Sequence, residues 1–581
     1  MANFLDKIKV NTAVKDHVKL DLSCDHISTA NFMQFNVAWS KEMVPGEKIS
    51  VNMETFTRLQ PMPVPTFGRA RINNRAFFVP FRTIFPGWND FITDTKHSFA
   101  NGTAAIINYA PRISNNGLFN FLFDSSANSE TVTNGSAYDY EIKAKDNVTK
   151  FVKMKEAGRR YIKILQSLGY VIPTEFLKED VYFSALPLLA VGKVYYDWYY
   201  PSAYTDSVEA VNLNALFNED TTADLVFNAT AISNILTVIK TVCYDSDYFV
   251  SAWQNPSAPN DGSYSGFSIP DITLGTTNNN AVVNNNTEGT PNIRTGVTGN
   301  ISQYLLQGLR SLTDYMKRHQ LVGARALDRY MTRFGIQLSA EKLKRSVYIG
   351  TTSDDIQFGD VTSTSDTAGA SLGDYAGKGL GYGKSNFDFE TDEYGIMIIV
   401  SSILPKAGYF QGVDRNVMHT TKLDYWTPEF DNMGTQAISK AELFVPTRTG
   451  VLNGTMKDLT DGVFGWTPRY AEYKVGRDRL TGDFRMNSMN VDLGAWHTMR
   501  EFDYSTLDAM VVNKNFTDGI DAEQYNRIFY GTNDSSLADK FTVIYHFDVA
   551  SYSPMKALFD TYDFEEKGKE VTMNANGVKM N

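Results

Sequence analysis

Runs of residues that are typical of β-strands lie far apart in this sequence, and this spacing limits the fold more than any other feature. Four such strand-like runs span residues 32–85, 393–403, 481–493 and 541–551. In the first, Ile49, Val51 and Met53 alternate with polar neighbours, as expected for a half-buried strand. A βαβ protein alternates short strands and helices regularly, so the spacing predicts a mainly β sandwich with long insertions between strands.

Several of the insertions carry apolar residues at spacings of three and four, which is the helical period. The clearest is 301–336, where the pattern continues on both sides of Gly323 and predicts a pair of consecutive helices. A further helix is predicted from 157 to 168. Ser184 and Pro187 are suited to open another, because Ser caps a helix and Pro fits its first turn.

Length and charge exclude some classes of protein. The chain has 581 residues, more than the roughly 250–300 at which a single hydrophobic core stops growing, so several domains or one domain with large insertions are expected. A hydrophobic fraction of 43% is ample for folding. The net charge of -11 argues against a protein that coats nucleic acid generally, because such proteins are basic.

The sequence indicates a soluble product of a reducing compartment. Its two cysteines, Cys24 and Cys243, allow one bridge at most, and we expect two free thiols. Residues 1–21 are interrupted by charge and do not resemble a secretory signal. We find no run of the roughly 20 apolar residues that a membrane helix needs, so no membrane insertion is expected.

No motif in the sequence predicts catalysis or a cofactor. The glycine-rich stretch 377–385 fails the phosphate-loop pattern, because Gly379 and Gly383 are separated by three residues where four are needed, and we interpret it as a flexible turn or an interface arm. The histidines are scattered without the spacing of a helical metal site. We therefore expect no catalytic, cofactor or metal residues, with a weak Ca²⁺ site at a subunit contact left open as an alternative.

Basic residues gather in three places, each of which is either a nucleic-acid contact or a solvated, salt-bridged surface. Two clusters lie at 69–75 and 342–345. The third is our preferred nucleic-acid contact, because tyrosines that can stack an unpaired base directly precede its arginines. It consists of Tyr470, Tyr473, Arg477, Arg479 and Arg485.

The stretch from 409 to 444 is rich in aromatic side chains and has no nucleophile, base or metal cluster, which is typical of a surface that packs. Its order of motifs, YxQGxDR, then aromatic-Trp-x-Pro-x-Phe, then GxQA, resembles the major capsid proteins of the microviruses, especially the gokushovirus-like branch. Further matching segments bracket most of the chain. The residues that carry the resemblance are Pro45, Gly46, Phe77, Phe78, Pro80, Trp88, Trp198, Gln411, Gly412, Asp414, Arg415, Trp426, Pro428, Gly482, Phe484, Arg485, Trp496 and His497.

The resemblance implies a fold and a role. The fold would be an eight-stranded antiparallel jelly roll of the viral capsid type, a single domain over 1–581 whose long insertions contain several α-helices. About sixty copies would close a T=1 icosahedral shell through pentamers and threefold contacts. The insertion at 202–300, followed by the helical pair 301–336, would project at the threefold axes and take part in host attachment.

The resemblance also implies partners. These are further copies of the chain, a circular single-stranded DNA genome, a small basic DNA-packaging protein, an internal scaffolding protein and a host cell-surface receptor. The protein would be found in the virion after assembly in the bacterial cytoplasm, and it would not be an enzyme.

Two other classes stay open on sequence alone. A carbohydrate-binding β-sandwich also exposes Tyr and Trp, to stack sugars, but would usually carry a signal peptide and remain a monomer or small oligomer. A polysaccharide hydrolase would need two carboxylates placed across a cleft.

Overall fold

The computed structural model describes most of the chain between residues 17 and 555. The described residues are 17–123, 140–143, 149–152, 154–171, 181–200, 208–252, 307, 311, 330–331, 334–336, 344–362, 375–406, 408–422, 424–431, 435–444, 451–452, 455–456, 463–485, 493–502, 524–529 and 539–555. They belong to two compact units. Unit 1 comprises Met1–Asp245, Ser339–Gln411 and Arg477–Asn581; unit 2 comprises Ser246–Leu338 and Gly412–Gly476. A single domain over 1–581 stays a prediction.

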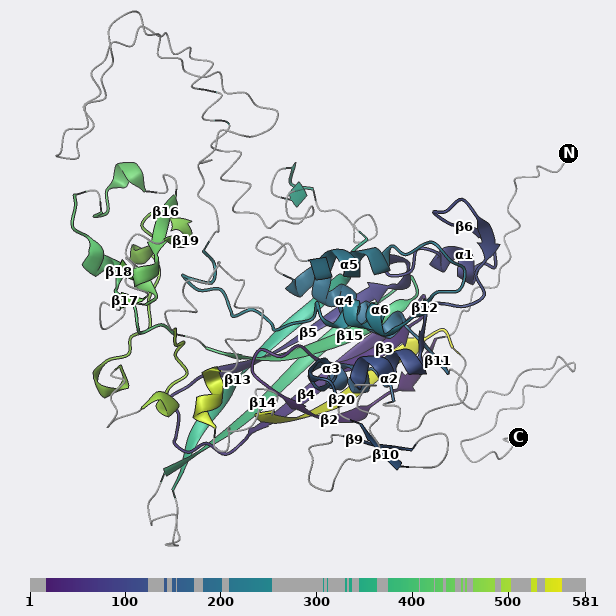
Figure 1. Ribbon diagram of the computed structural model, residues 1–581, viewed down its shortest axis with the longest axis horizontal. Helices are drawn as coiled ribbons and strands as arrows, with labels where there is room; N and C mark the ends of the chain where they lie inside the picture. The colour runs from purple at the N-terminus through teal and green to yellow at the C-terminus, as the bar shows by residue number, and fades with distance from the viewer. Residues whose placement is uncertain are drawn as a thin grey trace, which may run out of the picture. The chain divides into compact units, whose positions relative to one another are not determined.

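Unit 1 is built on one large antiparallel sheet (Figure 1). Its strands are β1 (Val18–Asp21), β2 (Cys24–Ala30), β3 (Asn36–Met43), β4 (Lys48–Leu59), β5 (Ala70–Pro80), β13 (Val347–Thr362), β14 (Tyr375–Glu390), β15 (Gly395–Pro405) and β20 (Phe541–Ser553). Their order is β1-β20-β4-β14-β13-β5-β15-β3, and β2 also pairs with β20. The mainly β, jelly-roll fold is confirmed. The predicted number of eight strands is not, because the described part of this sheet has nine.

The sheet curls so that strands distant in its order face one another. Trp39 of β3 and Phe547 of β20, near opposite ends of the order, have ring centroids 6.0 Å apart. Phe78 of β5 and Phe389 of β14, two strands separated only by β13, have ring centroids 4.9 Å apart. The predicted alternation is present in β4, where the side chains of Ile49, Val51 and Met53 are buried and their neighbours are more exposed. The buried faces of the curled sheet therefore form the core of the unit.

The glycine-rich stretch is part of strand β14, so its interpretation as a flexible turn is wrong. Glycine recurs at every second position, which places these glycines on one face of the strand. A Cβ on Gly379 would lie 2.6 Å from Leu59, and one on Gly383 would overlap the carboxylate of Asp354. The glycines thus leave room for side chains of the two neighbouring strands.

Helices cover the sheet of unit 1 beside β3, β5 and β15 (Figure 1). The helices of unit 1 are α1 (Trp88–Ile92), α2 (Asn115–Leu122), α3 (Glu156–Ser167), α4 (Leu186–Val194), α5 (Val208–Phe217) and α6 (Ala229–Leu236), with the 3₁₀ turn η1 (Phe81–Thr83) and a π-helical turn η3 (Tyr195–Tyr199). Of these, α3 packs on β3. Because α4 packs on β5 and β15, β15 is buried along its whole length. The helices predicted at 157–168 and after Ser184 are confirmed as α3 and α4. The predicted cap is wrong, because Ala185 rather than Ser184 is the N-cap of α4.

Short strands connect these helices within unit 1. They are β6 (Lys96–Ser98), β7 (Ala104–Ile106), β8 (Arg112–Ser114), β9 (Tyr140–Lys143), β10 (Thr149–Val152), β11 (Tyr182–Ser184) and β12 (Val226–Phe227). β6 pairs with β7, β9 with β10, and β8 with both β11 and β12.

Two predicted insertions are described only in part. Within 202–300, residues 208–252 include α5 and α6, whose side chains Leu213, Phe217 and Ile235 are buried. Residues 253–300 and most of the helical pair 301–336 lie outside the described residues. The projecting insertion and the helical pair therefore stay predictions.

The strand-like run predicted at 481–493 is wrong for its described part. The 3₁₀ turn η8 (Gly482–Phe484) occupies its start, because Gly482 adopts a positive φ of 69° that breaks an extended chain. Residues 486–492 lie outside the described residues. Two further 3₁₀ turns of unit 1 are η9 (Gly494–Trp496) and η10 (Gln524–Ile528).

Unit 2 has little regular structure among its described residues. Strands β16 (Thr435–Ser439) and β19 (Val463–Pro468) pair antiparallel, as do β17 (Val451–Leu452) and β18 (Thr455–Met456). Its 3₁₀ turns are η4 (Arg415–Met418), η5 (Pro428–Phe430), η6 (Lys440–Glu442) and η7 (Ala471–Tyr473). Hydrogen bonds between side chains and the backbone connect these irregular segments to one another.

Candidate functional site

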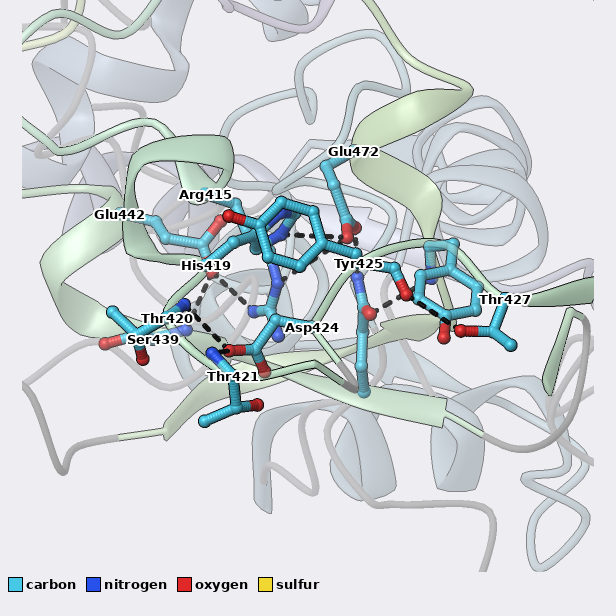
Figure 2. A network of polar contacts seen from close by, with 12 residues as sticks. Arg415, His419, Thr420, Thr421, Asp424, Tyr425, Thr427, Ser439, Glu442 and Glu472 are labelled. Atoms are coloured by element: carbon cyan, nitrogen blue, oxygen red, sulfur yellow. Dashed lines mark hydrogen bonds and ion pairs between the residues drawn. The ribbon is translucent and has the colours of Figure 1, made fainter.

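A buried carboxylate organises the motif-rich part of unit 2 (Figure 2). The Glu442 side chain has no exposed surface, and its Oε1 lies 2.9 Å from Nη1 of Arg415. Glu442 also completes a capping box with Ser439 at the start of η6. Tyr248 donates a hydrogen bond to Oε2 of the same carboxylate at 3.2 Å. The charge of Glu442 is thus fully paired and hydrogen-bonded, as a buried charge requires.

Only glycine fits at position 412. A Cβ on this residue would overlap the carbonyl oxygen of Glu442, which is backbone and has little freedom to move. The next residue, Val413, donates its N–H to the carbonyl of Ala441 at 3.0 Å. Asp414 then begins η4, and its carbonyl accepts the N–H of Val417 at 3.0 Å. This close backbone approach positions Arg415 beside Glu442.

A second acid, Glu472, lies next to the first. Gln436 donates its side-chain amide to Glu472 and accepts the backbone N–H of Tyr470 at 3.0 Å. Nε2 of His419 is 3.5 Å from Oε1 of Glu472, and its ring stacks on Tyr473. In Figure 2, Arg415 and His419 both point towards Glu472. The two acids and their partners tie η4, η6 and η7 together.

This network supports an exposed aromatic loop. Thr420 and Thr421 donate their backbone N–H groups to Asp424 at 2.9 and 2.7 Å, and these bonds, that of Thr421 first, lower the pKa of its carboxyl group. Directly after this turn, Tyr425 is 56% exposed and Trp426 is 50% exposed. Pro428 then opens η5. Large aromatic side chains held outward on a fixed loop suit packing against another molecule.

The start of the same motif lies in unit 1. Gln411 forms a reciprocal pair with the backbone of Phe502: its amide donates to the carbonyl at 3.1 Å and its Oε1 accepts the N–H at 2.7 Å. Arg500 is fully buried, donates to the hydroxyl of Tyr409 at 3.2 Å and lies against the rings of Tyr244 and Phe502. These contacts are structural.

The other amino-terminal and central motif residues also form core contacts. Gly46 takes a φ of 82° after Pro45, as the second central position of a type II turn requires. Phe77, Phe78 and Pro80 are buried in β5. Nε1 of Trp198 donates to Ser346 at 2.9 Å, and the guanidinium of Arg345 lies 3.8 Å from the centroid of the Trp198 ring system. The ring centroids of Trp88 and Phe81 are 4.7 Å apart.

The carboxy-terminal motif residues gather around an aromatic side chain that the sequence analysis missed. Phe67 stacks on Trp496 with centroids 5.8 Å apart, and it forms a T-shaped pair with Phe484 with centroids 6.3 Å apart. His497, by contrast, is buried and packs against Phe410. The signal for Phe67 is its place in a proline- and glycine-flanked loop between two strands.

The predicted nucleic-acid contact falls in both units. Tyr470 and Tyr473 belong to unit 2, where Tyr470 is buried and Tyr473 is half exposed. Arg477, Arg479 and Arg485 belong to unit 1, where the last two are exposed. The five residues therefore stay a prediction as a group.

Within the described ranges, no group of three or more His, Cys, Asp and Glu side chains could hold a metal ion, and no helix is long and apolar enough to cross a membrane. Cys24 is exposed and Cys243 half-buried, and both are free thiols. Burial raises the pKa of the Cys243 thiol to about 11.

The sequence pattern of the family described as Capsid protein (F protein) matches residues 8–144 and 142–561. The chain belongs to this capsid protein family. The resemblance to gokushovirus-like capsid proteins is thereby confirmed, and the family is one of structural proteins rather than enzymes.

Two curated relatives of this capsid protein family agree. Capsid protein VP1 of Bdellovibrio phage phiMH2K is 22% identical over 515 residues, which cover 82% of this chain and 83% of the relative. Capsid protein VP1 of Chlamydia phage 1 is 26% identical over 213 residues, 36% of this chain. That alignment spans only about a third, 35%, of the Chlamydia phage protein.

Proposed function

We propose that this protein is the subunit of an icosahedral T=1 shell that encloses a circular single-stranded DNA genome. A role as a capsid protein, and so as a component of the virion, follows from the family. The observation that carries the proposal is the family match, which extends from residue 8 to residue 561 over a mainly β, curled sheet.

Assembly would depend on repeated contacts between copies. The loop bearing Tyr425 and Trp426 offers exposed aromatic surface, and the Glu442 network fixes its position in advance. Aromatic residues are enriched at protein interfaces, and rigid contacts repeated by symmetry close a shell at a lower entropic cost. About sixty copies, arranged through pentamers and threefold contacts, would complete it.

Further partners follow from the same proposal. With a net charge of -11, the subunit does not by itself neutralise an anionic genome, which supports a separate small basic packaging protein. An internal scaffolding protein would guide assembly in the bacterial cytoplasm. Residues 202–300 would project at the threefold axes and contact a host cell-surface receptor.

Nuclease protection tests the proposal. Particles of the protein should be purified from producing cells and treated with DNase and RNase, and their contents should then be extracted. We expect circular DNA that a single-strand-specific nuclease degrades. Particles that protect only RNA or duplex DNA would contradict the proposed genome, and a dispersed protein that binds polysaccharide would favour the carbohydrate-binding alternative.

A further inference from the structure

Phe67 is an exposed aromatic ring mounted on other aromatic rings. It is 74% exposed, although it stacks on Trp496 at an interplanar angle of 29° and meets the edge of Phe484 at 80°. A large apolar ring left in water forgoes the stabilisation that burial would give it, so an exposed ring on a rigid support indicates a binding partner.

The support of this ring is rigid. Phe67 donates its backbone N–H to the carbonyl of Trp496 at 2.7 Å, and the hydroxyl of Thr66 donates to the carbonyl of Ala495 at 2.7 Å. On the other side of Phe67, a Cβ on Gly68 would overlap the side chain of Thr498. Two segments far apart in sequence are thus joined on both sides of the ring, which fixes its orientation before any partner binds.

Exposed basic residues lie on the segments that carry the Phe67 ring and its support. Arg69 is two residues beyond Phe67 and exposed, and its carbonyl accepts the N–H of Lys406, also exposed, at 2.8 Å. Arg485 directly follows Phe484 and is exposed. The same carboxy-terminal segment contributes Arg477 and Arg479, together with the acids Asp478 and Asp483. The segments that carry Phe67 and Phe484 therefore hold more basic than acidic residues, in a chain that is acidic overall.

A stacked aromatic ring among cations fits single-stranded nucleic acid. An unpaired base offers a π-face to the ring, and its phosphates meet the cations, whereas a duplex hides the faces of its bases. We propose that Phe67, supported by Trp496 and Phe484, stacks an unpaired base of single-stranded DNA, while Arg69, Lys406 and Arg485 contact neighbouring phosphates. This inference rests on the proposed genome, and it concerns a site separate from the predicted contact at Tyr470 and Tyr473.

Binding of a labelled oligonucleotide tests the site. Fluorescence anisotropy with fluorescein-labelled oligo-dT should be measured on the full-length, unassembled subunit. Stacking on one aromatic side chain contributes about 1–3 kcal/mol, so we expect Phe67→Ala and Phe67→Leu to weaken binding roughly 5- to 150-fold. Phe67→Trp should retain it. Tyr552→Ala, which removes a half-exposed ring from β20, is the matched control and should bind like the unaltered chain.

Salt dependence separates the cations from the ring. Each lost phosphate contact lowers the slope of log K against log salt by about 0.7 for a single strand. Arg485→Gln should therefore flatten the slope by about that amount, whereas Phe67→Leu should leave the slope unchanged. Circular dichroism confirms that each variant is folded, and the Phe67→Leu variant keeps the test decisive where the alanine variant does not fold.

Two further results would contradict the proposed DNA site. Unchanged DNA affinity in a folded Phe67→Leu variant overturns the site. If that variant binds DNA normally but no longer forms particles, the ring is a contact between copies of the chain instead. Electron microscopy of the unaltered chain reports particle formation separately, so a failure of shell assembly is distinguishable from a failure of DNA binding.

Discussion

Gly412 lies against the main-chain carbonyl of Glu442 so closely that no side chain fits between them. This approach brings two parts of the family motif together, and it explains why glycine stands between Gln411 and Asp414. The Arg415–Glu442 ion pair at 2.9 Å depends on the same approach.

Gly412→Ala should destabilise the protein by several kcal/mol, because the new Cβ meets backbone that cannot move without breaking the turn. Thermal unfolding followed by circular dichroism measures the effect. Gly476→Ala is the control, since nothing lies within 4 Å of a Cβ at that position, and it should change stability by less than about 0.5 kcal/mol. Equal melting temperatures for the two variants would contradict the close approach.

Glu442→Gln should also be strongly destabilising. It removes the nearer of the two buried counter-charges of Arg415 and leaves only Glu472, 4.0 Å away, and breaking a fully buried pair costs about 3–5 kcal/mol. Arg415 is partly exposed, so we expect a somewhat smaller loss. Lys474→Gln breaks the exposed pair with Asp431 and should cost only about 0–1 kcal/mol in the same denaturation assay. A Glu442→Gln variant as stable as Lys474→Gln would argue against the network.

His97 should make stability depend on pH. Its two ring nitrogens each lie 2.5 Å from a carboxylate, of Asp90 and of Asp220, and both can donate only when the ring is protonated. The hydrogen bond to Asp90, opposed by burial and aided by Asp220, raises the pKa of His97 above its ordinary value. The stabilisation is therefore complete below about pH 6.5, the unfolded value, and is lost as pH rises through the higher folded pKa.

Melting temperatures across pH 5.5 to 9 measure this dependence, a range that spans the ordinary histidine pKa of about 6.5. The unaltered chain should lose more stability over the range than His97→Gln. Asp90→Asn should shift the midpoint of the loss towards lower pH, because the largest cause of the raised pKa is gone. Parallel curves for all three proteins would show that His97 does not contribute.

The two thiols should react at different rates. Cys24 is exposed, whereas Cys243 is half-buried with a pKa of about 11, so little thiolate forms there near neutral pH. We expect fast labelling of one thiol by a disulfide reagent and slow labelling of the second unless the chain is unfolded. Failure to detect any thiol in the unfolded chain would indicate a bridge.

The sequence predicted those parts of the fold that follow from local periodicity. Alternation at Ile49, Val51 and Met53 predicted a half-buried strand, and the spacing of three and four in 157–168 predicted a helix. The glycine-rich strand β14 was misjudged because its glycines make room for Leu59 and Asp354, which lie far away in the sequence. Only the three-dimensional pairing of β14 with β4 and β13 shows that reason.

The candidate sites were also hard to predict, because their residues contact partners that lie far away in the sequence. Arg500 is fully buried against Tyr244 and Tyr409, and none of these partners is near it in sequence. No local sequence pattern singles out Phe67, and its stacking on Trp496 is visible only in the three-dimensional structure. The motif as a whole was found by its order of residues, and the structure supplies the physical reason for Gly412 and Arg415.

Electron microscopy of the purified, negatively stained protein tests the central claim, that copies of this chain close into a shell. We predict uniform, hollow or filled isometric particles roughly 250 to 300 Å across, as expected for closure by icosahedral symmetry with a subunit of this size. A protein that stays monomeric under every assembly condition, including the presence of single-stranded DNA and a basic packaging protein, would contradict it.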